Sequence, residues 1–350
     1  MTKHMHGGDV YKYKDCLDFS ANLNPLGTPE SVKQAIIKSL DHIAQYPQVG
    51  CDILREKIAE YEGVQKDEVI CGNGAAEVIF TLCRAVNPKK ALIPAPTFAE
   101  YGQALHSTGC ELEYYMLTEN AGFVLGEEYL DILHKGLDMA FLCNPNNPTG
   151  MLIPHRLLKR ILEKCRKLDI LLVVDECFLD FVKEPQEYSL KRSLSGFNNL
   201  FILKAFTKRY AMAGVRLGYG LCSNRKLLEK MELCVQPWNV STMAQAAGIQ
   251  ALTETEYVEK GRQTVFQESQ WLKEEMTRIG YQVFPSEANY IFFKGPEELF
   301  DFCLRKRILI RDCSNYPGLT KGFYRIAVKT HEENVKLIEV LEGGILWQKQ

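Results

Sequence analysis

Four polar side chains in the middle of the chain have the types and the order that cofactor-dependent catalysis needs. They are Asn147 in NPNNPTG, Asp175 at the end of LLVVD, Lys208 in FTK and Arg216 in AGVRLGYG. A lysine can form a Schiff base with an aldehyde, an aspartate can keep a pyridine nitrogen protonated, and an arginine binds phosphate through a fork of donors. Together the four residues predict an enzyme that uses pyridoxal 5'-phosphate.

Lys208 carries the chemistry in this interpretation, although most loop lysines are simply exposed and charged. Arg209 and Arg216 follow it closely in the sequence. Neighbouring positive charge lowers the pKa of a lysine and makes its amine nucleophilic. The hydroxyl of Thr207 adds a donor for the cofactor phosphate. We therefore expect Lys208 to bind the cofactor covalently.

Asp175 follows the apolar run 170–174, which should place it at the end of a buried strand. Glu176 is the competing carboxylate, but alternation along a strand directs it to the opposite face, so we expect Asp175 to contact the pyridine nitrogen. Asn147 has two interpretations. It is part of a turn built on two Asn-Pro steps, or its amide donates to the ring hydroxyl of the cofactor, and its neighbours favour the second.

The segment GNGAAE follows an apolar run and opens a helical pattern, which places Gly74, Ala75 and Ala76 at a helix N-terminus. Free amides at such a position bind phosphate, although glycine-rich turns are also common structural features. Phe98 is either a core residue or a ring that stacks on the cofactor. One interpretation of Tyr46 is an ordinary surface tyrosine.

Composition excludes several classes of protein. The chain has 350 residues, 46% of them hydrophobic and 25% charged, with a net charge of −2, as in soluble globular proteins of two lobes. Dispersed Lys and Arg argue against binding to nucleic acid or a membrane surface. The N-terminal MTKHMHGGDV has no apolar run of a secretory signal. Twelve scattered cysteines form no metal-ligand spacing, so we expect no metal and a reducing cytoplasm.

Apolar runs alternate with amphipathic stretches through the first two thirds of the chain. The expected strands are 67–72, 90–96, 138–144, 170–176, 199–206 and 216–223, and helices are expected at 74–86, 98–107 and 154–167. Continuous apolar strands alternating with helices predict an α/β fold with a mainly parallel sheet covered on both faces. Ligands of such sheets bind at the carboxyl ends of the strands, where Asp175 and Lys208 are expected.

After residue 240 the pattern changes to an α+β lobe with two helices in 241–278 and short strands between later helices. We expect a large cofactor-binding domain of residues 47–240, and a small domain formed by residues 1–46 together with 241–350. The helix expected over 30–44 should pack on the C-terminal part.

Several segments resemble fold-type I pyridoxal-phosphate enzymes, the aspartate aminotransferase superfamily, and most of all the branch of the histidinol-phosphate aminotransferases. The segments are HGGD (6–9), LDFSANLNPLG (17–27), GNGAAE, FAEYG (98–102), NPNNPTG, DECFLDF (175–181), FTKRYAMAGVRLGYG (206–220), QPWNV (236–240), ILIRDCSNYPGL (308–319) and YRIAVK (324–329). The resemblance implies a seven-stranded type of sheet in the large lobe. It also implies a homodimer with shared active sites, in which Tyr46 reaches the cofactor phosphate of the other subunit.

The resemblance assigns further roles. Phe98 would stack on the cofactor ring, and Arg325 would hold a substrate carboxylate. Candidates for the rest of the substrate, including a phosphate, are His6, Asn22 and Arg311.

Two positions depart from the aminotransferase pattern. Phe178 stands where those enzymes carry a tyrosine that reaches the ring hydroxyl, and Ala205 stands where relatives often have serine or threonine. With HGG and ILIRDCSNYPGL, Phe178 favours decarboxylation of a small phosphorylated amino acid over transamination. A histidinol-phosphate aminotransferase is the alternative. A non-catalytic cofactor-binding regulator is a third possibility, against which the intact Lys208 argues.

Overall fold

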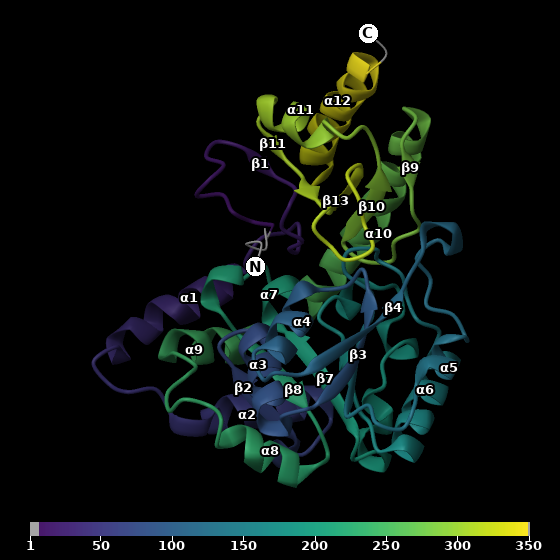
Figure 1. Cartoon of the computed structure of the whole chain (residues 1–350). Coiled ribbons are helices and arrows are strands. Elements are labelled where there is room, and N and C mark those ends of the chain that lie inside the picture. The colour runs from purple at the N-terminus through teal and green to yellow at the C-terminus, as the bar shows by residue number, and fades with distance from the viewer. Residues whose placement is uncertain (1–6, 349–350) are drawn as a thin grey trace.

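A seven-stranded sheet forms the centre of the larger of two lobes (Figure 1). The computed structural model describes residues 7–348. The strand order is β2-β8-β7-β6-β5-β3-β4, with parallel pairs from β4 to β7 and with β8 antiparallel to both of its neighbours. The strands are β2 (Val69–Gly72), β3 (Lys90–Ala95), β4 (Glu111–Met116), β5 (Met139–Cys143), β6 (Leu171–Asp175), β7 (Leu200–Ala205) and β8 (Gly218–Leu221). The expected α/β fold is confirmed.

The strand β4 was not among those expected from the sequence. It lies at the edge of the sheet, and its side chains are exposed or only partly buried. Its sequence ELEYYM therefore lacks the continuous apolar run that marks strands buried on both faces. All six strands that the sequence predicted are present, with ends shifted by at most two residues.

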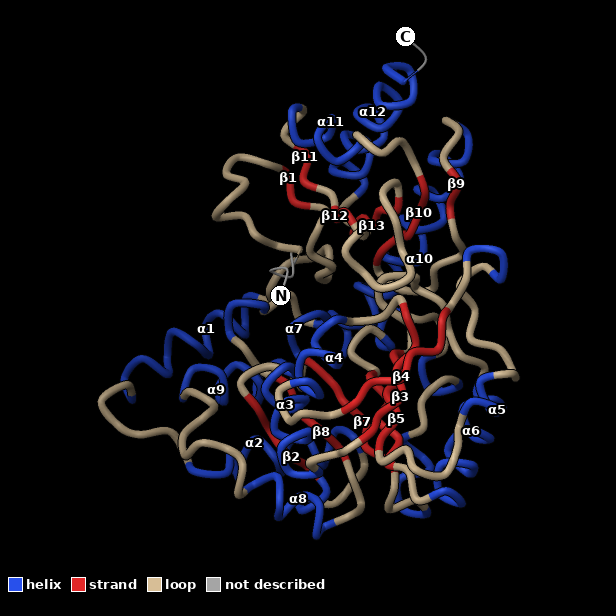
Figure 2. Tube along the Cα trace, in the orientation of Figure 1, coloured by secondary structure: helices blue, strands red, loops and turns tan. Residues whose placement is uncertain are grey.

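Helices cover both faces of this sheet (Figure 2). They are α1 (Glu30–Ser39), α2 (Asp52–Glu62), α3 (Ala75–Val86), α4 (Ala99–His106), α5 (Tyr129–Ile132), α6 (His155–Leu168), α7 (Phe206–Arg209), α8 (Arg225–Glu232) and α9 (Thr242–Ala251). Residues of α3, α4 and α8 join one buried cluster, and residues of α2, α6 and α9 join the other. Strand alternation separates the clusters, since Val173 faces the first while Leu172 and Val174 face the second.

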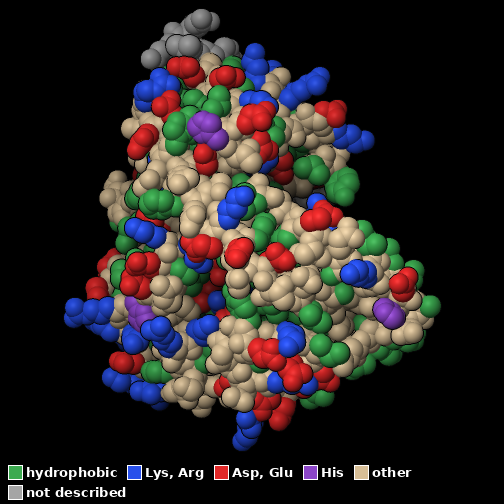
Figure 3. Space-filling model, turned by 180° about the vertical axis from the view of Figure 1, so that it is seen from behind, with side chains coloured by type: hydrophobic (Ala, Val, Ile, Leu, Met, Phe, Trp, Pro, Cys, Tyr) green, Lys and Arg blue, Asp and Glu red, His purple; other side chains and the backbone are tan. Residues whose placement is uncertain are grey.

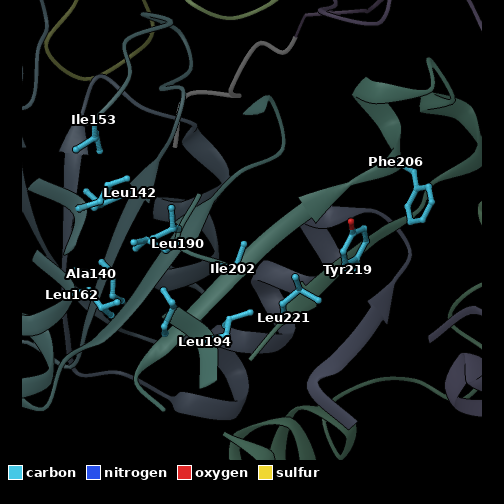
Figure 4. Packing of buried hydrophobic residues seen from close by; sticks show 14 of the residues in the cluster. Ala140, Leu142, Ile153, Leu162, Leu190, Leu194, Ile202, Phe206, Tyr219 and Leu221 are labelled. Carbon is cyan, nitrogen blue, oxygen red and sulfur yellow. The ribbon is translucent and has the colours of Figure 1, made fainter. Parts of the chain in front are cut away.

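The second cluster is packed from strands, helices and loops together. Figure 4 shows Ala140, Leu142 and Ile202 of the sheet near Leu162 of α6 and Leu190 of a loop. In α6 the buried positions recur at the spacing of one helix face, which explains why this stretch lies flat on the sheet.

The smaller lobe surrounds a four-stranded antiparallel sheet, ordered β12-β13-β10-β9. Its elements are β1 (Leu17–Asp18), α10 (Thr255–Arg278), β9 (Gln282–Val283), β10 (Tyr290–Lys294), α11 (Leu299–Arg305), β11 (Ile308–Leu309), β12 (Arg311–Asp312), β13 (Phe323–Ala327) and α12 (His331–Gln348). Phe19 belongs to its core, whereas Val32 of α1 and Ala244 of α9 join the core of the large sheet. Helix α1 packs against α9, and the domain boundaries stay a prediction.

Across residues 7–348, no helix is long and apolar enough to cross a membrane.

A buried network of charges lies beneath the sheet. Lys204 of β7 places its amine 3.5 Å from Glu62 and 3.7 Å from Glu176, and both carboxylates are almost completely buried. Lys191 adds a second cation 2.8 Å from Glu62. Burial alone would raise the pKa of Glu62, but the charges of Lys204 and Lys191 lower it to about 2. The network ties α2, β6 and β7 together.

Replacing Lys204 with methionine should destabilise the fold, because Glu62 and Glu176 would lose a buried partner that Lys191 replaces only in part. We expect the free energy of unfolding to fall by about 3–5 kcal/mol in denaturant titrations. The control is Lys57→Met, which removes an exposed pair with Glu60 and should have little effect. Equal losses in both variants would contradict the prediction.

Candidate active site

One pocket collects most of the side chains that the sequence singled out. It lies at the carboxyl ends of β5, β6 and β7 and is closed on its other side by residues of β12 and β13. The predicted residues that line it are Asn22, Ala75, Ala76, Phe98, Asn147, Asp175, Thr207, Lys208, Arg216, Arg311 and Arg325, together with Phe178 and Ala205. The sheet register explains the convergence, because Asp175 is paired with Cys143 on one side and with Leu203 on the other.

Lys208 lies in α7, directly after β7, and its backbone is held from the N-terminal segment. The N–H of Asn24 donates to the carbonyl of Lys208 at 3.0 Å, and the amide of Asn24 donates to the carbonyl of Arg209 at 2.9 Å. Arg209 itself turns away from the pocket and pairs with Asp180 at 2.7 Å. These contacts fix the turn from which the Lys208 side chain projects.

The Lys208 amine has the properties of a nucleophile. Burial, followed by the charges of Arg325 and Arg216, lowers the pKa of Lys208 to about 8. Its amine lies 5.5 Å from the centre of the Phe178 ring, and no hydrogen bond joins it to another residue within 7–348. A neutral, unbonded amine is therefore accessible near neutral pH, as attack on a carbonyl requires.

Asp175 is a buried carboxylate with two protein donors. The hydroxyl of Tyr101 donates to one oxygen at 2.6 Å, and the N–H of Cys177 donates to the other at 2.8 Å. Burial raises the pKa of Asp175, while these donors and the charge of Lys208 oppose the rise. Glu176 lies on the opposite face, where Ser189 and the N–H of Leu190 donate to it, in agreement with the predicted alternation.

The N-terminus of α3 and Arg216 form a cradle for an anion. No side chain caps α3, so the first amides of this helix are free to bind. Gly74 has φ +84°, and a Cβ atom there would overlap the Arg216 guanidinium. Gly74 thus stands behind Arg216 instead of lining the pocket, and its missing side chain leaves room for the guanidinium.

Two buried arginines form the wall on the small lobe. Arg311 of β12 and Arg325 of β13 are direct cross-strand partners, so their side chains project from the same face of the sheet. Arg325 donates to the side-chain oxygen of Asn147 and, at 2.9 Å, to the carbonyl of Ser20, while its Nε has no partner among the described residues. Arg311 donates to Asn315 at 2.8 Å. The wall offers two fixed positive charges to an anionic ligand.

Asn22 also faces the pocket, and its buried Oδ1 atom has no hydrogen-bond partner among residues 7–348. Tyr46 is not part of this pocket. Its side chain is 79% exposed and stacks on Trp238, with ring centres 4.4 Å apart. His6 lies outside the described residues.

The sequence did not single out Tyr101, Ser20 or Tyr316, although all three belong to segments that it marked as informative. Tyr316 lines the pocket beneath the Arg311 guanidinium, 5.2 Å from ring centre to charge. Aromatic residues are frequent in cores, so the type alone carried no signal. No group of three or more His, Cys, Asp or Glu side chains that could hold a metal is found in the described part of the chain.

Known proteins resemble the whole chain. The model of the family described as aminotransferase class I and II matches residues 14–341. A threonine-phosphate decarboxylase of Salmonella typhimurium is 39% identical, covering 97% of this chain and 96% of the relative. The structure is similar to a histidinol-phosphate aminotransferase from Clostridium acetobutylicum, with a TM-score of 0.88, 31% identity, and 94% and 99% of the two chains covered.

An L-threonine-O-3-phosphate decarboxylase from Porphyromonas gingivalis has the same fold, with a TM-score of 0.82 at 24% identity, covering 95% of this chain and 99% of the other.

Pyridoxal phosphate is the cofactor of this group of proteins, and the pocket fits it. The open N-terminus of α3, Thr207 and Arg216 would hold its phosphate. Lys208 would react with its aldehyde, and Asp175 would face its ring nitrogen. Phe98 lines the pocket, where it would stack on the cofactor ring, and it makes a T-shaped contact with Tyr101 with ring centres 5.4 Å apart. Ala205 supplies no donor, so Thr207 is the hydroxyl on this turn.

Lys208 should react with aldehydes at lower pH than ordinary lysines do. In full-length protein freed of cofactor, reductive methylation followed by peptide mass spectrometry should show Lys208 reactivity rising through a midpoint near pH 8. Arg325→Met should move this midpoint to higher pH, because Arg325 is the positive charge that lowers the pKa of Lys208 the most. Lys57 is the internal control, since its pairing with Glu60 raises its pKa. Parallel pH profiles for both lysines would refute the assignment.

Proposed function

The chain belongs to the family of class I and II aminotransferases, and on this premise we propose that it decarboxylates L-threonine O-3-phosphate. The product would be (R)-1-aminopropan-2-ol O-phosphate, a building block of cobalamin, and serine phosphate is a second candidate substrate. The observation that carries the proposal is the 39% identity, over nearly the full length of both chains, with a protein named threonine-phosphate decarboxylase.

The pocket has groups suited to such a substrate. Pyridoxal phosphate, when bound, supplies an electron sink for the bond that breaks at the α-carbon of the substrate. Arg311 and Arg325 would bind the two anionic ends, the phosphate and the carboxylate, from one face of the small sheet. Two fixed points orient a small molecule, and orientation decides which of its bonds can break. With its lowered pKa, Lys208 would return a proton to the α-carbon.

Phe178 supports decarboxylation over transamination. Its ring packs edge-on against Tyr290, 5.0 Å between centres, and beneath the Lys208 amine. It has no hydroxyl that could donate to the cofactor ring. In this place the phenylalanine supplies packing alone, and Asn147 would be the remaining donor to the ring hydroxyl. Its amide nitrogen is available for this, because its oxygen already accepts from Arg325.

A histidinol-phosphate aminotransferase is the second candidate, favoured by the close structural match to a protein of that name. Both substrates carry a phosphate, so Arg311 serves either reaction. Histidinol phosphate itself has no carboxylate, so in an aminotransferase Arg325 would instead bind the carboxylate of the keto acid that accepts the amine.

Product analysis separates the candidates. The cofactor-loaded protein should release carbon dioxide and aminopropanol phosphate from threonine phosphate. It should form no keto product from histidinol phosphate, even when a keto acid is supplied to accept the amine. Lys208→Ala should lose several orders of magnitude of activity, whereas the exposed-site variant Lys57→Met should keep it. Amine transfer without carbon dioxide would establish the aminotransferase. No turnover with threonine phosphate, serine phosphate or histidinol phosphate would favour the regulatory alternative.

We further propose a homodimer with shared active sites. Hydrophobic side chains gather on the projection seen at the right of Figure 3, where α1 and the turn after it lie. The exposed ones in this region include Ile37, Ile43, Tyr46, Val49 and Ile53. A group of exposed apolar side chains in one region is typical of a protein interface. Tyr46 is thereby available to a neighbouring subunit. A reducing cytoplasm is proposed as well, in keeping with twelve free cysteines.

Mixing inactive subunits tests the shared site. A dimer of one Lys208→Ala subunit and one Tyr46→Phe subunit would contain one site with both residues intact. Activity of the co-expressed mixture should therefore exceed the sum of the two parent variants, and light scattering should give the mass of a dimer. A monomer, or a mixture no more active than its parents, would contradict the proposal.

A further inference from the structure

Tyr101 contacts a residue of the site, and the mechanism described so far gives this contact no role. It lies on α4, its side chain is fully buried, and its ring stacks on Phe141 with centres 4.9 Å apart and an angle of 18°. Phe98 makes a T-shaped contact with the same ring. The ring is thus held between the pocket and the sheet, and its hydroxyl can point in only a narrow range of directions. That direction is toward Asp175, 2.6 Å away.

The carboxylate of Asp175 has a limited number of acceptor positions. Two oxygens offer about four lone pairs, of which Tyr101 takes one and the N–H of Cys177 another, each on a different oxygen. The two donors prevent rotation of the carboxylate and leave its remaining lone pairs on the side of the pocket. A hydrogen bond from a phenol to a carboxylate at this distance is of the charge-assisted, stronger kind.

We propose that Tyr101 is a positioning residue, whose hydroxyl orients Asp175 and keeps it ionised for the ring nitrogen of pyridoxal phosphate. This inference rests on the cofactor role proposed for Asp175, but it holds for either reaction of the substrate.

The surroundings of Asp175 explain why such a donor is needed. Burial opposes the charge of the carboxylate. The titratable groups that face it are Tyr101 from α4, Cys143 from β5, Tyr290 from β10, Lys208 from α7 and its near neighbour Cys177. Lys208 is the only cation of this set, and its charge opposes the rise in the pKa of Asp175 less than the hydrogen bonds do. The donors of Tyr101 and Cys177 are therefore the main groups that keep the carboxylate ionised.

Loss of the hydroxyl would raise the pKa of Asp175, so the carboxylate would be less able to hold a proton at the ring nitrogen of the cofactor. Tyr101→Phe retains the stack on Phe141 and removes only the donor. We expect kcat to fall about tenfold or more, as for loss of a hydrogen bond to a charged group. KM for threonine phosphate should change little, because Tyr101 is not among the residues that line the pocket.

The experiment needs a readout other than turnover. Infrared spectra of the full-length protein, recorded across pH without and with cofactor, report the protonated carboxyl band of Asp175, identified by its loss in Asp175→Asn. In Tyr101→Phe this band should appear at higher pH than in the natural protein. Replacing Tyr101 with 3-fluorotyrosine, a more acidic donor, should shift the band the opposite way. Each direction of the shift is thus tested by a variant that keeps the aromatic ring.

Tyr281→Phe is the matched control. Tyr281 is also buried, and its hydroxyl donates to the carbonyl of Leu341 at 2.9 Å, remote from the pocket. It measures the cost of removing a buried phenol hydroxyl in general, and should leave kcat and the Asp175 band unchanged. If Tyr101→Phe behaves like Tyr281→Phe, with lower stability but an unchanged band and kcat, the inference is wrong. Failure of decarboxylation itself would not affect the infrared result.

Discussion

The cost of keeping a carboxylate charged in a dry place governs the arrangement of this molecule. Asp175 ends a strand that is buried on both faces, where water cannot solvate it. Transfer of an unpaired charge to such a site is prohibitive, so the protein must provide donors and nearby cations. Tyr101, Cys177 and Lys208 meet that need from three different elements. The positions of α4 and α7 around β6 follow from this requirement.

The same sheet handles two buried lysines in opposite ways. Lys204 and Lys208 are four residues apart, but Lys204 lies among carboxylates, which raise its pKa despite its burial. Lys208 lies among guanidinium groups, which add to the effect of burial and lower its pKa. One lysine is thereby a permanent cation that holds elements together, and the other is a reactive amine. The sign of the neighbouring charge, and not depth in the protein, distinguishes a structural lysine from a chemical one.

Much of the site could be predicted because its residues stand at strand ends. The apolar run 170–174 places Asp175, and the parallel pairing with β7 brings it to the same edge of the sheet as Lys208, which follows β7. The edge strand β4 was missed because half-exposed strands lack a continuous apolar pattern. Tyr101 was missed for another reason: its partner lies 74 residues away in the sequence, and only packing of α4 on the sheet brings the two together. Local patterns predict where a polar residue follows an apolar run. They do not predict which distant side chain will form a hydrogen bond with that residue.

The contact between Arg325 and Asn147 has a consequence for how the protein discriminates among ligands. It joins the two lobes through a side chain that, under the proposed function, also binds the carboxylate of the substrate. Arg325 is therefore already extended and aligned before any ligand arrives, so little side-chain freedom remains to be lost on binding. A ligand must nonetheless compete with, or share, the amide oxygen that occupies the guanidinium at rest. The Asn147 oxygen therefore selects among ligands. Weakly basic or neutral compounds gain nothing by approaching Arg325, whereas a carboxylate binds the guanidinium more strongly than a neutral oxygen does.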